Sequence, residues 1–494
     1  QSLHYHLYAL DFYLLALVIA RRTGDGAADT FAEVASRMAR FCRAMTDQTG
    51  RLPTIGDDDG GALFPICGRA PFDAAPSLCL AATLLNEPHL AIGPLAEEML
   101  WMTAGIEPSG QVALAEPAPP PETILFPDTG YASLRAPHGH AIVDAGPHGF
   151  LNGGHAHADA LSMTLAVDGR PLLIDPGTAT YVMNPKMRDR FRSTAMHNTV
   201  EVGGRSQSVP AGPFQWATRT DARVLRWLPS SGFDYFEAEH TGYLPTVHRR
   251  TVVRIDDLWL IADHIFGGRA EPVALHWHLD PAWKVDERPG SRMYVAEAGG
   301  TRIVIACTAP SGEQFHGDGD GLGWCAPIYG QVMASPTLRF SHPATAPPSM
   351  ETVVSMVPMV TMVTMIGPTN DTPATLEPLA VQPGTGDGSR CSAVKFTYLG
   401  DRYLAIFKVP EVDRPAGARA INRIVVESGE LSTDAHAAVL RLTMDDEPMA
   451  LDLISGSHAA WTGPAPFAFT GPVAADLHSD STVLRQLGRG TQRW

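Results

Sequence analysis

The residue types with the clearest capacity for chemistry lie between positions 155 and 197. His155 and His157 are two residues apart in the segment GGHAHADALS. Asp175 ends an apolar run, and His197 follows after a further loop. On a β-strand side chains alternate between faces, so His155 and His157 would project from the same face. Two imidazoles, a carboxylate and a third imidazole can close a divalent metal site with an acid/base group beside it. This pattern predicts an enzyme rather than a generic β protein.

The residues around this set are of kinds that position ligands. A Pro-Gly pair forces a tight turn directly after Asp175, and Asn198 can orient the imidazole of His197. Asp159 lies two positions beyond His157, and we interpret it as structural or as an outer partner of the site. A lone histidine is more often structural than functional, so the prediction depends on four suitable groups in one stretch.

Three arginines precede His197 at alternating positions, Arg188, Arg190 and Arg192. On a strand they would line one face and could meet a carboxylated substrate. For Arg188 and Arg190 we favour pairing with surface acids, and Arg192 remains a candidate substrate contact.

An acidic, glycine-rich segment, Asp57-Asp58-Asp59-Gly60-Gly61, resembles a calcium loop in composition only. It lacks the alternating ligands and the terminal glutamate of an EF-hand. We therefore predict a solvated turn between helices, with a carboxylate that helps to bind sugar as the alternative.

The composition sets limits on the function. The chain has 494 residues, 45% hydrophobic and 18% charged, which is typical of an ordinary soluble globular protein of two or three domains. Its formal net charge of −16 argues against nucleic-acid binding, and a polyanionic substrate would need a locally basic cleft. The six cysteines are scattered without a CxxC pair, which disfavours a zinc ribbon and excludes a dense disulfide framework.

Helical patterns dominate the first hundred residues. Residues 7–22 form one predicted helix, and the others are expected at about 29–45, 76–85 and 94–104. Asp11 interrupts the apolar run 7–20 and no basic leader precedes it, so this segment is predicted to be a buried helix rather than a signal peptide or membrane span. Because the chain starts inside a helix, we expect that upstream sequence has been lost. The pattern indicates a helical bundle or part of an α/α toroid.

The composition changes at a proline-rich tract around residues 116–122, which is typical of a stiff linker. Short β-rich runs alternate with turns beyond it, whereas residues 353–366 could be strand or helix. We therefore predict a multidomain α+β protein with helices over 1–115, a linker over 116–125 and a large antiparallel β-sandwich region over 126–494. That region could be subdivided near 340–390.

Three segments resemble the heparinase II/III family of polysaccharide lyases: GGHAHADALSMTLAVDGRPLLIDPGTATY, RFRSTAMHNTVEVGGRSQS and GWCAPIYG. Weaker matches are QSLHYHLYALDFYLLALVIARR and FPDTGYASLR. The resemblance covers most of residues 1–330. It implies an N-terminal (α/α) toroid packed on an antiparallel β region, β-elimination of uronic-acid polysaccharides, and a zinc ion in the β domain. A periplasmic or secreted bacterial location is expected.

The resemblance also assigns roles to residues. The zinc ligands would be His157, Asp175 and His197, with a mainly structural role for the ion because elimination consumes no water. His155 would be the catalytic histidine beside the metal, and Tyr5 the catalytic tyrosine of the toroid. Further candidates for substrate contact are Arg192, Tyr181 and His4.

The mechanism implied by the resemblance makes physical sense of these residue types. Neutralising the uronate carboxylate lets charge spread when the C5 proton leaves, and an acid must then protonate the departing O4. A tyrosine, with an ordinary pKa of about 10, can act as the base when cationic neighbours lower its pKa. It can then return the proton as the acid.

The sequence departs from the family at two points. The asparagine–histidine pair that handles the substrate carboxylate has no counterpart, and Arg190 stands where an aromatic residue is more usual beside Phe191. The expected partner is an acidic polysaccharide or oligosaccharide. The negative net charge favours an alginate-like or bacterial exopolysaccharide uronan over densely sulfated heparin. A homo-oligomer is compatible with the sequence, and neither nucleic acid nor a membrane span is expected.

Two other functions fit parts of the pattern. A cupin-like oxygenase or isomerase would use the HxH pair on a strand with a more distant histidine, although a cupin also requires a glutamate a few residues further on. A non-catalytic carbohydrate-binding protein would keep the β-sandwich and the metal as a scaffold. The identity of the metal and the effect of Tyr5→Phe on lyase activity distinguish these alternatives.

Overall fold

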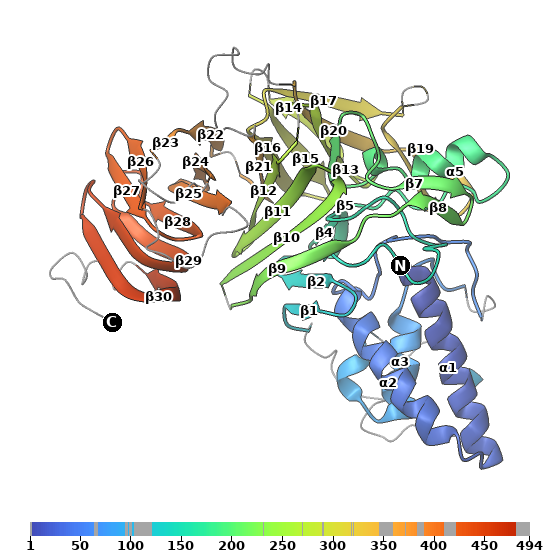
Figure 1. The fold of residues 1–494 in the computed structure, drawn as a ribbon. Coiled ribbons are helices and arrows are strands. Elements are labelled where there is room, and N and C mark those ends of the chain that lie inside the picture. Colours follow the sequence, from blue (N-terminus) through green and yellow to red (C-terminus); the bar gives the residue numbers. More distant parts are fainter. Residues whose placement is uncertain are drawn as a thin grey trace.

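Helices form the first part of the computed structural model and sheets form the rest (Figure 1). The residues that the structure describes are 2–63, 68–93, 97, 101–102, 121–230, 232–268, 270–288, 291–317, 319, 321–344, 359–370, 372–382, 390–409 and 421–480. The helices are α1 (Leu3–Thr23), α2 (Ala28–Met45), α3 (Ala75–Leu85) and the short 3-10 turn η2 (Pro88–Leu90). The predicted helices at 7–22, 29–45 and 76–85 are therefore confirmed, whereas the one at 94–104 lies largely outside the described residues.

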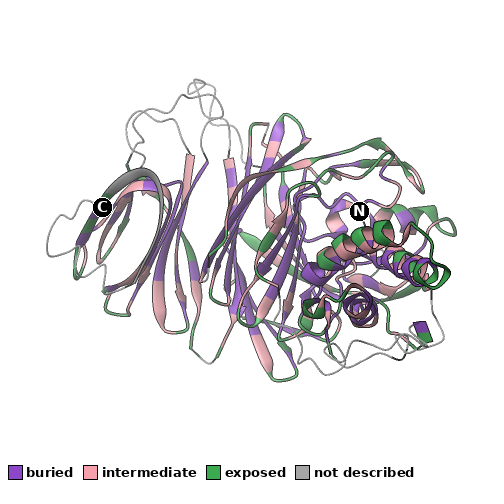
Figure 2. Ribbon diagram, turned by 90° about the horizontal axis from the view of Figure 1, so that it is seen from below, coloured by how far each residue is buried: buried purple, intermediate pink, exposed green. Residues whose placement is uncertain are grey.

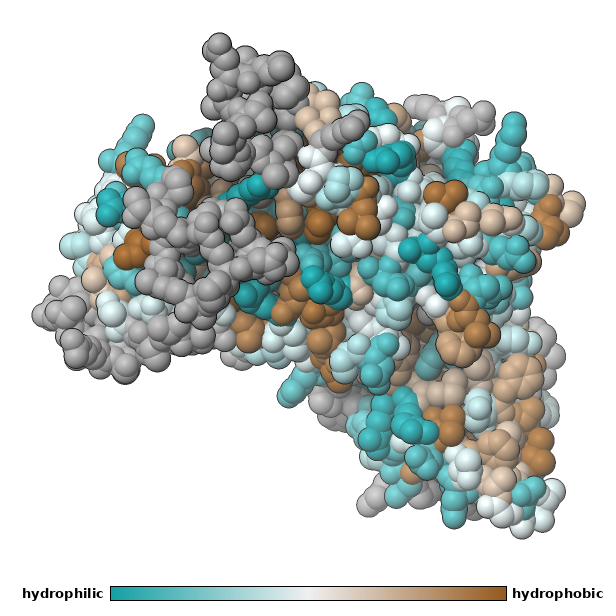
Figure 3. Space-filling view, viewed as in Figure 1, coloured by the Kyte–Doolittle hydropathy of each residue, from teal (hydrophilic) through white to brown (hydrophobic). Residues whose placement is uncertain are grey.

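Helix α1 has clear start and stop signals. The Ser2 hydroxyl accepts a hydrogen bond from the amide of Tyr5, and Gly24 ends the helix in the left-handed conformation. The helix is long and apolar enough to cross a membrane by length and composition, yet 44% of its most apolar window is buried within the protein. Phe12 and Ile19 remain exposed on α1. Figure 3 shows hydrophobic residues along this side of the helical region.

Two sheets build the β region next to the helices. The first has the order β1-β2-β3-β4-β5 and the second the order β14-β15-β16-β21-β12-β11-β10-β9. The strands of the first sheet are β1 (Ile124–Phe126), β2 (Tyr131–Arg135), β3 (Gly139–Asp144), β4 (Met163–Val167) and β5 (Arg170–Leu173). The strands of the second are β9 (Ala222–Leu228), β10 (Phe233–Tyr243), β11 (Thr246–Ile255), β12 (Leu258–Phe266), β14 (Lys284–Arg288), β15 (Met293–Ala298), β16 (Thr301–Cys307) and β21 (Met359–Pro368).

Smaller sheets and one helix complete the middle of the chain. A four-stranded sheet has the order β17-β20-β13-β6, and two hairpins pair β7 with β8 and β18 with β19. Their bounds are β6 (Val200–Val202), β7 (Val209–Gly212), β8 (Gln215–Thr218), β13 (Val273–His278), β17 (Ser311–His316), β18 (Trp324–Ile328), β19 (Gln331–Ala334) and β20 (Pro336–His342). Helix α5 (Pro185–Phe191) and the 3-10 turn η3 (Thr194–Met196) lie between β5 and β6.

The last sheet follows the path β22-β24-β25-β28-β29-β27-β26-β23, with β30 paired to β29. Its strands are β22 (Thr375–Leu379), β23 (Val381–Gln382), β24 (Arg390–Tyr398), β25 (Asp401–Val409), β26 (Asn422–Val426), β27 (Gly429–Thr433), β28 (Ala437–Leu442), β29 (Pro448–Trp461) and β30 (Phe467–Asp480). The ambiguous run 353–366 is thus a strand where it is described, because β21 belongs to the second sheet. The predicted domain ranges and the subdivision near 340–390 stay predictions.

Burial follows the stacking of these sheets. Figure 2 shows buried residues on the facing strands, with exposed residues on the outer faces of the helices. One core fills the space between the first, second and four-stranded sheets, and another joins the second sheet to the last. The helical core includes Tyr131 of β2 and Ile142 of β3, so the helices pack directly on the first sheet. This contact brings the loop after α2 against the loops that carry the histidines.

Candidate functional site

Asp57, from the loop between α2 and α3, is the carboxylate on which the site converges. Its side chain is fully buried and lies 3.2 Å from Nδ1 of His155 and 3.0 Å from Nε2 of His157. The Arg188 guanidinium donates to both of its oxygens, and the Thr178 hydroxyl adds a longer contact of 3.4 Å. Burial alone would raise the pKa of Asp57, but His155, His157 and Arg188 hold it well below its usual range. Asp57 is therefore an ionised acceptor.

The ionised Asp57 decides the tautomers of both histidines. A carboxylate can only accept, so Nδ1 of His155 and Nε2 of His157 carry the protons that face it. In neutral imidazoles the lone pairs then lie on Nε2 of His155 and on Nδ1 of His157. The His155 side chain is 45% exposed and that of His157 is 1% exposed, so one lone pair is reachable by a substrate and the other is enclosed.

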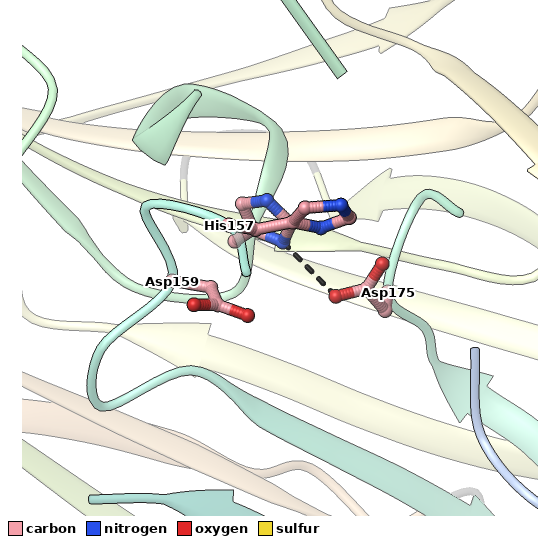
Figure 4. A group of neighbouring side chains, drawn as sticks. His157, Asp159 and Asp175 are labelled. Carbon is pink, nitrogen blue, oxygen red and sulfur yellow. Dashed lines mark hydrogen bonds and ion pairs between the residues drawn. The ribbon is translucent and has the colours of Figure 1, made fainter. Parts of the chain in front are cut away.

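Four buried side chains gather around a point next to His157. One candidate ligand atom from each of His157, Asp159, Asp175 and His197 lies within 4.8 Å of the others. Figure 4 shows His157, Asp159 and Asp175 directed toward one another. Nδ1 of His197 is 3.0 Å from Oδ2 of Asp175. The structure therefore brings together the three predicted zinc ligands, and it adds Asp159 to the set.

The polar atoms of this cluster suit a divalent cation. Nδ1 of His157 and Nε2 of His197 are buried without a hydrogen-bond partner, which is costly unless another group occupies the space. Burial would lower the pKa of His197, but the carboxylates of Asp175, Asp159 and Asp144 raise it above its usual value. Imidazole nitrogens and carboxylate oxygens are zinc ligands, and Asp57 matches the outer carboxylate that commonly orients a zinc-bound histidine.

Local contacts hold the loops that carry these ligands. The backbone amide of Gly177 donates to Oδ1 of Asp175 at 3.0 Å, as the predicted tight turn requires. The Asn198 side chain donates to the carbonyl oxygens of Met163 and Ile174 and accepts from the amide of His278. Asn198 thus fixes the segments on either side of the cluster rather than the imidazole itself.

Tyr5 and His155 face one another although they come from the helical and the β regions. Their ring centroids are 4.4 Å apart. The Tyr5 hydroxyl is 2.8 Å from that of Tyr181, whose backbone amide donates to the hydroxyl of Tyr329. The part-buried phenols and the exposed imidazole therefore form one polar surface.

The electrostatic surroundings of Tyr5 differ from those expected from sequence. Burial, together with Asp59 and Asp57, raises its pKa well above the ordinary value, and only the bond to Tyr181 opposes this. The pKa of Tyr181 is raised in the same way by burial and by Asp57. Cationic neighbours are expected to lower the pKa of Tyr5. The charged groups that shift it among the described residues are instead the carboxylates of Asp59 and Asp57. In this state Tyr5 is a neutral phenol, which suits a proton donor.

Arg188 and Arg190 lie on a helix rather than a strand, because Asn184 caps α5 and Pro185 occupies its first turn, and Arg192 follows directly after the helix. Arg188 is buried and bound to Asp57, so the prediction of a surface contact for Arg188 is wrong. Arg192 is also buried and donates to Asp189 and to the carbonyl oxygen of Gly212. The substrate contact expected of Arg192 stays a prediction.

Two further expectations about local structure are corrected. His155 and His157 lie in a loop rather than on a strand, and they share a partner because the loop folds around Asp57. The acidic segment 57–61 is not a solvated turn at its start, because Asp57 and Asp58 are buried and Asp59 is the one exposed carboxylate of the three. The amide of Asp57 donates to the carbonyl oxygen of His155 at 3.2 Å, which joins the two loops.

A cavity of about 430 Å³ borders the cluster. His157 and Asp159 line it together with Tyr131 and Asp144. Burial and the nearby Asp159 raise the pKa of Asp144 to about 7. The carboxyl group of Asp144 therefore lines the same cavity as the candidate metal ligands His157 and Asp159.

Sequence reasoning missed the central role of Asp57 and Arg188. Both belong to segments that it singled out, but their partners lie 98 to 131 residues away. Burial of an aspartate in an acidic, glycine-rich loop has no local sequence signal.

Residues 118–358 match the family model described as "Heparinase II/III-like, C-terminal". The structure resembles a heparan sulfate lyase from Pedobacter heparinus, with a TM-score of 0.60 and 16% identity over 84% of this chain and 59% of that one. It also resembles a heparinase III, with a TM-score of 0.58 and 15% identity over 83% of this chain and 60% of that one. The chain thus spans about three-fifths of these structures, and no curated protein sequence matches it.

Proposed function

Because residues 118–358 match the heparinase II/III-like family model, we propose that the chain is a polysaccharide lyase of this family that cleaves a uronic-acid-containing polysaccharide or oligosaccharide by β-elimination. The observation that carries this proposal is the pairing of Tyr5 with His155 across the contact between the helical and β regions, at 4.4 Å between ring centroids. A proton acceptor and a proton donor side by side are the two groups that an elimination requires.

The tautomers assign the two roles. Asp57 accepts the Nδ1 proton of His155, so Nε2 is free to take the C5 proton of the uronate. Tyr5 is held neutral by burial and by acidic neighbours, so its hydroxyl is the proton donor to the departing O4. Tyr181 orients that hydroxyl through the 2.8 Å contact. This assignment differs from the expectation that Tyr5 is both base and acid.

The buried cluster supports a zinc ion held by His157, Asp175 and His197, with Asp159 as a fourth candidate ligand. Zinc bound there would link the loops that flank His155, which is a structural contribution. The HxH pair lies in a loop, so the cupin-like alternative loses the strand on which it rested.

We also propose that the helices belong to an (α/α) toroid. In a toroid each helix packs between neighbours, and Phe12 and Ile19 on α1 are the surface that another helix would cover. Covering this side would remove the exposed apolar residues visible in Figure 3.

The test of the lyase activity uses a panel of sulfated and non-sulfated uronans, followed by the ultraviolet absorbance of the unsaturated product. We expect activity on at least one uronan and a loss of about 10²–10⁴-fold in Tyr5→Phe. Tyr13→Phe is the matched control, because Tyr13 lies on the same helix with an exposed side chain. Absence of product from every uronan with folded, zinc-loaded protein would remove the proposal, and equal activity in Tyr5→Phe would favour a different site.

Deuterium exchange separates the two proton transfers. If His155 is the base, Tyr5→Phe should still exchange the C5 proton of the substrate with deuterated water without cleaving it, whereas His155→Ala should do neither. Loss of exchange in Tyr5→Phe as well would make Tyr5 the base and overturn the assignment.

A further inference from the structure

A second group of potential cation ligands lies beside Tyr5 and is separate from the His157 cluster. It consists of His4, from the first turn of α1, with Asp58 and Asp59 from the loop between α2 and α3. One candidate ligand atom from each residue lies within 4.8 Å of the others. Nδ1 of His4 is 3.2 Å from Oδ1 of Asp58, and Nε2 of His4 is 3.4 Å from Oδ1 of Asp59.

The His4 imidazole has an unused nitrogen inside this group. His4 is 9% exposed, and its Nε2 is buried without a hydrogen-bond partner. The neighbouring Asp58 can accept the Nδ1 proton, which leaves the Nε2 lone pair directed at Asp59. This arrangement repeats that of His157, where one nitrogen faces a carboxylate and the other is free.

The group is held in place before any ligand arrives. The Ser2 hydroxyl donates to the carbonyl oxygen of Asp57, and the amide of Asp58 donates to the Thr178 hydroxyl at 3.1 Å. Amides of the following glycines donate to the two carboxylates, Gly60 to Asp58 and Gly61 to Asp59. The ligands thus belong to a fixed loop rather than to free surface side chains.

The negative charge around Asp58 and Asp59 would repel an acidic substrate. Asp57 is matched by Arg188, but Asp59 acts on the Tyr5 phenol and Asp58 adds a second carboxylate beside His4. A uronate would meet these carboxylates as it approached His155, and like charges at short range repel. A bound cation would cancel that repulsion.

We propose that His4, Asp58 and Asp59 bind a divalent cation that prefers oxygen ligands and accepts one imidazole, such as Mn²⁺. Two carboxylates with one histidine suit such ions, and water or a substrate carboxylate would complete their coordination. The role of the cation in admitting an acidic sugar rests on the proposed lyase function, whereas its binding does not.

The test is a titration with Mn²⁺ of protein preloaded with one equivalent of Zn²⁺, with free Mn²⁺ measured by electron paramagnetic resonance. We expect one Mn²⁺ site that is at least about tenfold weaker in His4→Gln and in Asp58→Asn, a difference of about 1.4 kcal/mol. Pulsed measurements should show modulation from a single imidazole nitrogen, which His4→Gln removes. Asp29→Asn, which removes an exposed carboxylate of α2, should bind as wild type.

Asp59→Asn guards against a folding artefact, because the Asp59 side chain is 41% exposed and its loss should leave the fold intact. If Asp59→Asn binds Mn²⁺ as wild type, or if wild-type protein does not bind Mn²⁺ beyond the zinc site, the proposal is wrong. Binding without lyase activity on any uronan would keep the site and remove the proposed function. Lyase activity with no second cation would do the reverse.

Discussion

Replacing Asp57 with asparagine should damage the fold, the metal site and the reaction together. In the native protein the Asp57 carboxylate accepts hydrogen bonds from His155, His157 and Arg188. The asparagine amide keeps one acceptor oxygen, but its NH₂ group would face donors. Arg188 is then left as a buried charge without its partner. The change is isosteric, so its effects report on charge and hydrogen bonding rather than on packing.

Three magnitudes follow from these contacts. Breaking a buried ion pair by removing one partner costs about 3–5 kcal/mol of folding stability. Loss of an outer partner of a zinc-bound histidine typically weakens metal binding by about 10–100-fold, which here acts through His157. Misplacement of a reacting group by about 1 Å can cost about 10²-fold in rate, which here acts through His155.

The assay compares Asp57→Asn with Asp234→Asn. Asp234 is equally buried and pairs with Arg254, and it also accepts from the amide of Ser230, but none of these residues contacts the site. Thermal unfolding, zinc retention against a chelator and turnover are measured for both variants. We expect both to lose stability and only Asp57→Asn to lose zinc affinity and turnover.

Equal zinc retention and turnover in the two variants would refute this reasoning. It would mean that His155 and His157 keep their orientations without Asp57, so that the tautomers deduced from this carboxylate are not enforced by it.

Three further predictions concern the metal, the pH dependence and a turn. Zinc at 100 times its dissociation constant should stabilise the protein by about 2.7 kcal/mol, and His197→Ala should abolish the resulting shift in unfolding temperature. Burial would raise the pKa of Glu237, but His436 and two arginines lower it to about 2. Its folded pKa is below its unfolded value of about 4.3, so its stabilisation of about 3 kcal/mol is present above that value and is lost as pH falls toward 2. Unfolding temperatures between pH 5 and 2 should therefore fall less steeply in Glu237→Gln, and parallel curves would contradict this. Gly177→Ala should destabilise the protein by about 1–3 kcal/mol and weaken zinc retention. The reason is that Gly177 has a φ of +74° and that an added Cβ would lie 2.2 Å from the carbonyl oxygen of Ala326. An unchanged unfolding temperature would show that the turn can relax.

Much of the local structure could be predicted because it depends on short-range patterns. The apolar spacing of residues 29–45 has a helical period, and α2 occupies Ala28–Met45. The short apolar run 258–263 is typical of a buried strand, and β12 extends from Leu258 to Phe266. The sequence does not predict helix α5, because Arg188, Arg190 and Arg192 alternate as they would on a strand, whereas the helix ends at Phe191, before Arg192.

In the candidate site, too, the features that depend on short-range patterns could be predicted from the sequence. The types and order of His155, His157, Asp175 and His197 are visible in the sequence, and they suffice to suggest a metal with an acid/base group beside it. The sequence alone also determined the turn after Asp175, because a Pro-Gly pair restricts the backbone locally.

Only the tertiary structure decided which groups these side chains face. Asp57 became a buried, ionised acceptor because the helices pack on the first sheet and bring Arg188 and the two histidines to it. The same packing set Tyr5 against His155 with acidic rather than cationic neighbours. The sequence determines the type of each residue. The protonation state of that residue depends on burial and on charges distant in sequence, and these surroundings exist only once the chain has folded.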